Sequence, residues 1–128
     1  MTDEYESGLR VAAEILGPEA SGALAGSLTS SSFGAQRGAL ALKYVMSELW
    51  CRPGLDRRGR SLVTLGILIA LRQTEELKIH AVAAVRNGCT VQEVEEAIYH
   101  ATAYAGFPAA NHAALVAGEA LRAGGLID

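Results

Sequence analysis

The sequence of 128 residues contains little cysteine and few aromatic side chains. Its two cysteines, Cys51 and Cys89, lie too far apart to form a CxxC redox motif or a zinc knuckle. We therefore expect two reduced, independent thiols, as is usual in a cytosolic protein. The three histidines form neither an HxxxH nor an HExxH pattern, so no metal site is predicted. A glycine-rich phosphate loop and a GxSxG elbow are also missing.

Long apolar runs and an excess of positive charge are missing as well. The longest apolar run, residues 62–71, is well short of the roughly 20 residues that a membrane span requires. The N-terminal segment is polar and acidic, which is unlike a signal peptide. A formal net charge of −3 argues against nucleic acid as the main partner. We therefore expect a cytoplasmic protein that binds neither membrane nor nucleic acid.

Half of the residues are apolar and 20% are charged, which is the composition of an ordinary globular protein. The length suffices for one domain with its own core, so residues 1–128 are predicted to form a single domain. Short chains of alanine-rich helices cover their own apolar surface incompletely. A homo-oligomer is therefore expected.

Signals for helices recur along the chain, and no segment has the alternating pattern of a strand. The helix after residue 60 is apolar almost all round and is predicted to be the central core helix. Thr74 is predicted to cap one helix, and Thr90 with Glu93 to form a capping box at the next. The sequence thus predicts an all-α fold. Its expected helices are residues 3–16, a short one after Pro18, 33–49, 57–72, 74–86, 91–105 and 109–123.

Four arginines surround a turn at the start of one predicted helix: Arg52, Arg57, Arg58 and Arg60. A guanidinium presents a planar pair of donors that matches a carboxylate, so this cluster could bind a small anionic ligand. A solvated basic turn is the alternative for each of them. Arg60 differs from the others because it lies at the edge of the apolar helix, where an unpaired charge is costly.

Glu76 and His80 are four positions apart and so lie on one face of their predicted helix. A carboxylate beside an imidazole orients the ring and raises its pKa, which suits a proton donor near neutral pH. An ordinary pair on a helix surface is the alternative.

A second helix carries Glu96, His100 and Tyr104 at the same spacing. Two of the three could transfer protons, but a polar stripe on an amphipathic helix is the more common explanation. His112, at the start of the last helix, is expected to be structural.

Five segments, in order and in register from about residue 48 to residue 111, resemble the carboxymuconolactone decarboxylase family of the AhpD-like superfamily. They are WCRPGL (50–55), RSLVTL (60–65), EELKIH (75–80), RNGCT (86–90) and YAGFPAAN (104–111). Another branch of this superfamily uses a CxxCxxxH motif for peroxidase chemistry. Counting back from His80, its two cysteine positions fall on Gln73 and Glu76. Since a disulfide cycle needs two nearby thiols, the resemblance points to the decarboxylase branch.

The resemblance implies an AhpD-like bundle of about six to seven helices that needs no cofactor and assembles as a trimer of dimers or a trimer. It implies a small anionic lactone or carbonyl substrate, and for the family's namesake the conversion of γ-carboxymuconolactone to β-ketoadipate enol-lactone and CO₂. In this interpretation His80 gives the proton and Glu76 orients it. The predicted substrate-binding residues are Arg52, Arg60, Trp50 and Tyr104.

Two other functions remain open. The same fold could serve a cofactor-free isomerase, cyclase or hydrolase acting on another small carbonyl compound. It could also serve a non-catalytic accessory oligomer. Cys51 stands where the family commonly has Ser or Thr, which is compatible with a changed substrate pocket.

Overall fold

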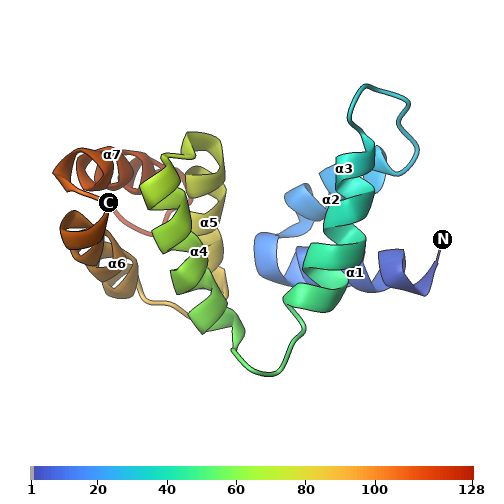
Figure 1. Cartoon of the computed structure of the whole chain (residues 1–128), viewed down its shortest axis with the longest axis horizontal. Helices are drawn as coiled ribbons and strands as arrows, with labels where there is room; N and C mark the ends of the chain where they lie inside the picture. Colours follow the sequence, from blue (N-terminus) through green and yellow to red (C-terminus); the bar gives the residue numbers. More distant parts are fainter. Residues whose placement is uncertain (1) are drawn as a thin grey trace. The chain divides into compact units, whose positions relative to one another are not determined.

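The computed structural model describes residues 2–128. These form two compact units, one ending at Asp56 and the other beginning at Arg57, and the single domain stays a prediction. No strand occurs in the described part of the chain, which confirms the all-α fold (Figure 1). The elements are α1 (Asp3–Leu16), α2 (Pro18–Ser27), α3 (Gln36–Leu40), η1 (Ala41–Leu49), α4 (Arg57–Leu71), α5 (Thr74–Arg86), α6 (Val91–Tyr104) and α7 (Phe107–Ala123).

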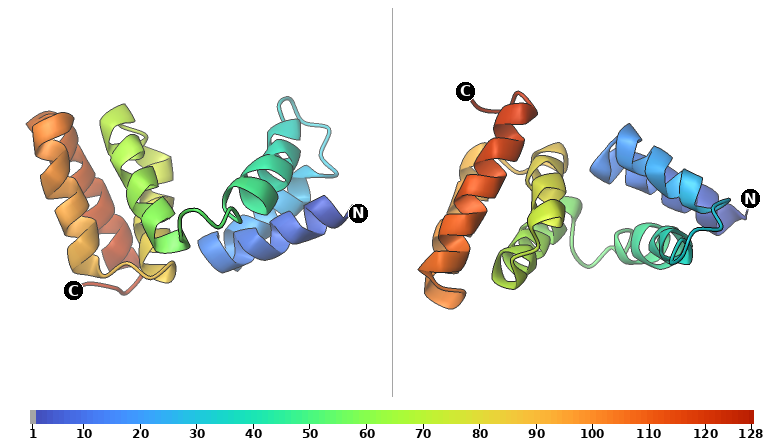
Figure 2. Two further views of the ribbon diagram at one scale, coloured as in Figure 1. Left: turned by 60° about the horizontal axis from the view of Figure 1, so that its bottom comes forward. Right: turned by 90° about the horizontal axis from the view of Figure 1, so that it is seen from above.

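In the first unit, α1 packs against α2 and η1 (Figure 2). Gly8 of α1 lies so close to the backbone of η1 that a Cβ atom would overlap the carbonyl of Leu42. Only glycine allows this approach. The core of the unit consists of Val11, Ala12, Ile15, Met46 and Trp50.

The chain between residues 33 and 49 differs from the single α-helix predicted there. Gly34 has a φ of 79°, which is outside the helical region, and α3 begins only at Gln36. From Ala41 to Leu49 the helix is of the π type, and the N–H of Trp50 continues its pattern by donating to the carbonyl of Val45 at 3.0 Å. The predicted end of the helix at Leu49 is correct, whereas its start and its type are wrong.

The second unit is a four-helix arrangement. Helix α5 packs against α4 and α7, and α6 packs against the same two helices, as Figures 1 and 2 both show. A partly buried hydrogen bond, 3.0 Å long, from Asn87 Nδ2 to Ser61 Oγ connects the end of α5 to α4. The core includes Leu65, Ile69, Leu77, Ala81, Val94, Ile98, Ala113, Val116 and Leu121.

Helix α4 is not the fully buried central helix that its composition predicts. Its Val63, Ile67 and Leu71 side chains are 52–62% exposed, whereas Ser61, Leu65 and Ile69 are buried. The reason is geometric, because each helix of a four-helix arrangement keeps an outer face. None of the described helices is both long and apolar enough to cross a membrane.

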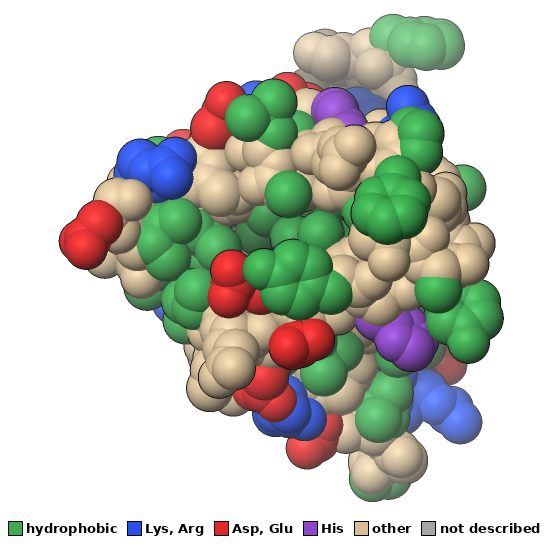
Figure 3. Space-filling view, turned by 90° about the vertical axis from the view of Figure 1, so that its left-hand side faces the viewer, with side chains coloured by type: hydrophobic (Ala, Val, Ile, Leu, Met, Phe, Trp, Pro, Cys, Tyr) green, Lys and Arg blue, Asp and Glu red, His purple; other side chains and the backbone are tan. Residues whose placement is uncertain are grey.

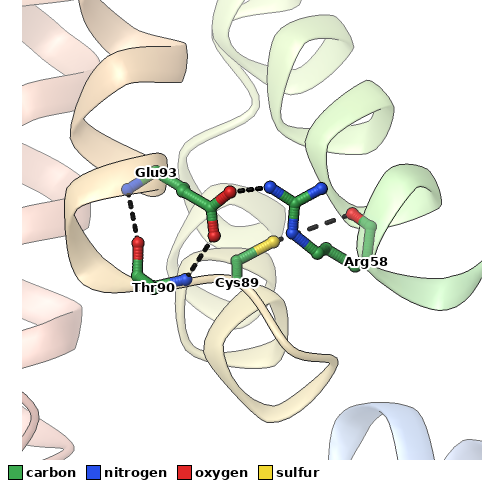
Figure 4. Close-up of polar contacts among 4 residues, drawn as sticks. All are labelled: Arg58, Cys89, Thr90 and Glu93. Carbon is green, nitrogen blue, oxygen red and sulfur yellow. Dashed lines mark hydrogen bonds and ion pairs between the residues drawn. The ribbon is translucent and has the colours of Figure 1, made fainter.

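Two predicted caps have different outcomes. The capping box of α6 is confirmed, since Glu93 N–H donates to Thr90 Oγ1 and Thr90 N–H donates to Glu93 Oε1 (Figure 4). At α5 the prediction is wrong: Gln73 occupies the N-cap position and makes no side-chain cap, and Thr74 is already inside the first turn. The short link from α4 causes this shift, because Arg72 turns the chain with a φ of 54°.

Candidate active site

His80 lies on α5 at the edge of the buried face of that helix. Leu77, Ala81 and Ala84 are buried on this face, at the spacing of successive helical turns. The side chain of His80 itself is only 12% exposed. An imidazole is thus held largely out of water inside the second unit.

Glu76 is one helical turn before His80, and the structure brings the two side chains together as predicted. Glu76 Oε2 lies 3.8 Å from Nε2 of His80, while the Glu76 side chain is 58% exposed. This distance is too long for a hydrogen bond and fits an electrostatic contact. The carboxylate therefore attracts a proton on the Nε2 side of the ring and remains accessible to water.

The other ring nitrogen of His80 has no hydrogen-bond partner among the described residues. Nδ1 is fully buried, and among residues 2–128 it is the only buried side-chain nitrogen or oxygen without a hydrogen-bond partner. Such a group costs about 1–3 kcal/mol, and native proteins retain few of them. Nδ1 is therefore a polar atom that a ligand group could satisfy.

Burial lowers the pKa of His80, and the charge of Glu76 raises it by less. The net pKa of His80 is thus below the ordinary value of an imidazole. The predicted direction was upward, and it is wrong because the loss of hydration around the ring outweighs a carboxylate that remains largely in water. The lowered pKa favours the uncharged form of the ring at neutral pH.

The arginine cluster separates into residues with different surroundings. Arg58 forms an ion pair with Glu93 at the start of α6, and its carbonyl oxygen accepts a weak bond from the buried thiol of Cys89, with 3.7 Å between S and O (Figure 4). Arg58 therefore joins α4 to α6. Arg60 is half-buried on α4, in the same unit as His80. Its role in binding a substrate stays a prediction.

Two of the predicted substrate-binding residues belong to the first unit. Trp50 is buried there in the same core cluster as Ile15 and Met46, so core packing explains its side chain. Arg52 is exposed in the turn after η1. Their contact with a substrate stays a prediction.

Tyr104, at the end of α6, is exposed, and its ring centroid is 5.1 Å from that of His100. His100 in turn lines an open depression of about 670 Å³ between α4 and α6, together with Glu93 and Glu96. Glu93 is paired with Arg58, and the charge of Glu96 would repel an anionic substrate. The polar stripe is therefore a poor candidate for the active site, while a role for Tyr104 stays a prediction.

A second hollow, of about 440 Å³, lies between α6 and α7. Figure 3 views this face, where hydrophobic side chains surround the hollow and acidic ones lie beside it. Its polar groups include Glu95 and Tyr99, whose hydroxyl donates to the carboxylate at 3.3 Å. The described residues that line it include no arginine or histidine, so it lacks the groups that hold a carboxylate.

Local sequence patterns did not reveal the partner of His112. Nε2 of His112, on α7, is hydrogen-bonded to the hydroxyl of Thr74 on α5 at 2.9 Å. This bond connects α5 to α7, which agrees with the structural role expected for His112. Among residues 2–128, no group of three His, Cys, Asp or Glu side chains could hold a metal ion.

The chain belongs to the carboxymuconolactone decarboxylase family, whose sequence model matches residues 38–119. It is 38% identical over 124 residues to the 4-carboxymuconolactone decarboxylase of Acinetobacter baylyi, covering 95% of this chain and 91% of that protein. It is 35% identical over 113 residues to the nitrosuccinic acid decarboxylase of Metarhizium robertsii, covering 88% of this chain and 77% of the relative. Both relatives are decarboxylases, in agreement with the predicted carboxy-lyase.

Proposed function

We propose that this protein is a cofactor-independent decarboxylase of the 4-carboxymuconolactone type, with His80 as the residue that handles the proton. The observation that carries the proposal is the geometry of the His80 ring. Nε2 faces the Glu76 carboxylate at 3.8 Å, and the buried Nδ1 has no partner among the described residues. A buried imidazole with one oriented and one free nitrogen is suited to proton transfer.

The substrates named for the two relatives share a chemical pattern that supports this function. In γ-carboxymuconolactone, one carbon carries a carboxylate, a CH₂–COO⁻ arm and an unsaturated lactone. In nitrosuccinate, one carbon carries a carboxylate, the same arm and a nitro group. Each is a substituted succinate in which the lactone or the nitro group can accept an electron pair. We infer this class of substrate for the present chain.

The reaction balances without a redox partner. The bond between the carbon and its carboxylate breaks and CO₂ leaves. In the lactone, the electron pair moves through the ring double bond onto the carbonyl oxygen. A proton is then added to the ring carbon next to that carbonyl, which gives the enol-lactone.

The uncharged form of His80 must first gain the proton that it delivers. A bound dianion would raise the pKa of the nearby ring, so that His80 takes up a proton from water. Nδ1–H would then donate to the substrate carbon, while Glu76 holds the Nε2 side. Arg60 and Arg52 are proposed to bind the two carboxylates, with Trp50 and Tyr104 as further contacts.

A homo-oligomer and a cytoplasmic location stay part of the proposal. The exposed apolar stripe of Val63, Ile67 and Leu71 on α4 is compatible with an interface between copies. A trimer of dimers, or a trimer, is the expected assembly.

The test is turnover of γ-carboxymuconolactone, followed by loss of absorbance together with release of CO₂. Nitrosuccinate is the second substrate, and succinate, which has no electron-accepting group, is the matched control that should not react. His80→Ala is expected to reduce kcat by about 10²–10⁴-fold. A folded wild-type protein that releases CO₂ from neither substrate would instead favour an isomerase, cyclase or hydrolase.

A further inference from the structure

The first turn of α5, which carries Glu76, begins at a strained and uncapped point of the chain. Arg72 has a φ of 54°, a conformation that costs a residue with a side chain about 1–2 kcal/mol. Gln73 follows at the N-cap position and contributes no side-chain cap. Local interactions alone therefore leave this turn free to fray.

A contact from another helix holds the turn in place. The hydroxyl of Thr74, the first residue of α5, is hydrogen-bonded to Nε2 of His112 on α7 at 2.9 Å. Both side chains are half-buried, so water competes less for this bond than for one on an exposed surface. Glu76 is two residues further along the same turn.

We propose that Thr74 and His112 are a positioning pair that fixes the Glu76 carboxylate beside Nε2 of His80. This inference rests on the proposed function for its catalytic meaning, and neither Thr74 nor His112 is assigned a contact with the substrate. The separation of 3.8 Å between Glu76 and His80 is the quantity that the pair controls.

The physical consequence follows from the position of Glu76. If the first turn frays, the exposed carboxylate moves away from the ring, and its charge no longer raises the pKa of His80. The Nε2 side of the ring also loses the group that orients it. Misplacement of a catalytic group by about 1 Å can reduce the rate by about 100-fold.

The experiment compares Thr74→Val, which removes the hydroxyl at constant shape, with Thr74→Ser, which keeps it. Thr102→Val is the matched control, because the Thr102 hydroxyl bonds a carbonyl of its own helix, that of Tyr99. The first measurement is the titration of the His80 ring by NMR, which requires no substrate. The second is kcat and KM for γ-carboxymuconolactone.

Thr74→Val should shift the titration of His80 to lower pH and reduce kcat by about tenfold or more, with a smaller change in KM. Thr74→Ser should restore both values, and Thr102→Val should leave them unchanged. If Thr74→Val does not fold, His112→Phe provides the second variant: its ring occupies similar space without a nitrogen for the Thr74 hydroxyl, so it should also shift the titration of His80 to lower pH.

A wild-type titration of His80 in folded Thr74→Val, with only a lower Tm, would show that the bond is merely structural and would overturn the inference. Failure of the proposed function has a different signature. In that case the wild type releases no CO₂, while the NMR comparison still decides whether Thr74 positions Glu76.

Discussion

Replacing His80 with leucine should make the protein more stable and, at the same time, inactive. Leucine is close to histidine in size and keeps the apolar contacts of a side chain that is only 12% exposed. It also removes Nδ1, the buried nitrogen without a partner among the described residues. Opposite effects on stability and activity are expected where a polar group is retained for function.

The magnitude follows from the groups that change. Removing an unsatisfied buried nitrogen returns part of a cost of about 1–3 kcal/mol. Leucine also has the better helix propensity, by a few tenths of a kcal/mol. The lost contact with Glu76 matters little, because the lowered pKa favours the uncharged ring at neutral pH and the carboxylate is 58% exposed. We expect a net gain of about 1 kcal/mol, which in a chain of this size raises Tm by roughly 3–5 °C.

Thermal unfolding followed by circular dichroism, at one fixed protein concentration, measures this change. His80→Asn is the control, because it keeps a buried polar group in a smaller side chain and should unfold at a lower temperature than the wild type. Both variants should lose about 10²–10⁴-fold in kcat. If His80→Leu unfolds several degrees below the wild type, the ring is a satisfied structural group and the reasoning about Nδ1 is refuted.

Three further predictions concern pH, the arginines and the helix packing. Burial lowers the pKa of His80 in the folded state, so the unfolded chain binds more protons at low pH. The stability of the wild type should therefore fall as the pH drops below about 6.5, measured by thermal unfolding. His80→Leu should lack this contribution to the pH dependence. Arg60→Gln should raise KM about tenfold or more, whereas Arg58→Gln should leave steady-state kinetics unchanged and cost less than about 1 kcal/mol. Gly8→Ala should lower the free energy of unfolding, measured with denaturant, by about 1–3 kcal/mol, because its Cβ would overlap the backbone of η1. Gly22→Ala, with open space around it, should raise that free energy by about 0.5–1 kcal/mol.

The sequence predicted those helices best whose ends are marked by nearby residues. The helix over residues 3–16 ends before Gly17 and that over 74–86 ends before Gly88; both glycines have positive φ, and both predicted ends agree with the structure. The capping box of Thr90 is equally local. The π-type turns of η1 were not predicted, because apolar spacing does not distinguish bonding to the fifth residue from bonding to the fourth.

The candidate site could be predicted only in part for a related reason. The spacing of Glu76 and His80 is a local property, and it correctly placed the two side chains together. The pKa of His80 depends on how much water the folded protein removes from the ring, which no spacing reveals. The bond between Thr74 and His112 joins residues 38 positions apart, so no local pattern contains it.

One short stretch of the second unit combines three departures from local rules. Within residues 72–80 lie a left-handed Arg72, a helix start without a side-chain cap and the buried Nδ1 of His80. Strained and unsatisfied groups persist where the surrounding structure holds them for function. The family resemblance suggested His80 as a proton donor, but an uncharged ring holds no acidic proton until its pKa rises. The proposed dianionic substrate can supply that rise, so the pKa seen in kcat should exceed the one seen in kcat/KM.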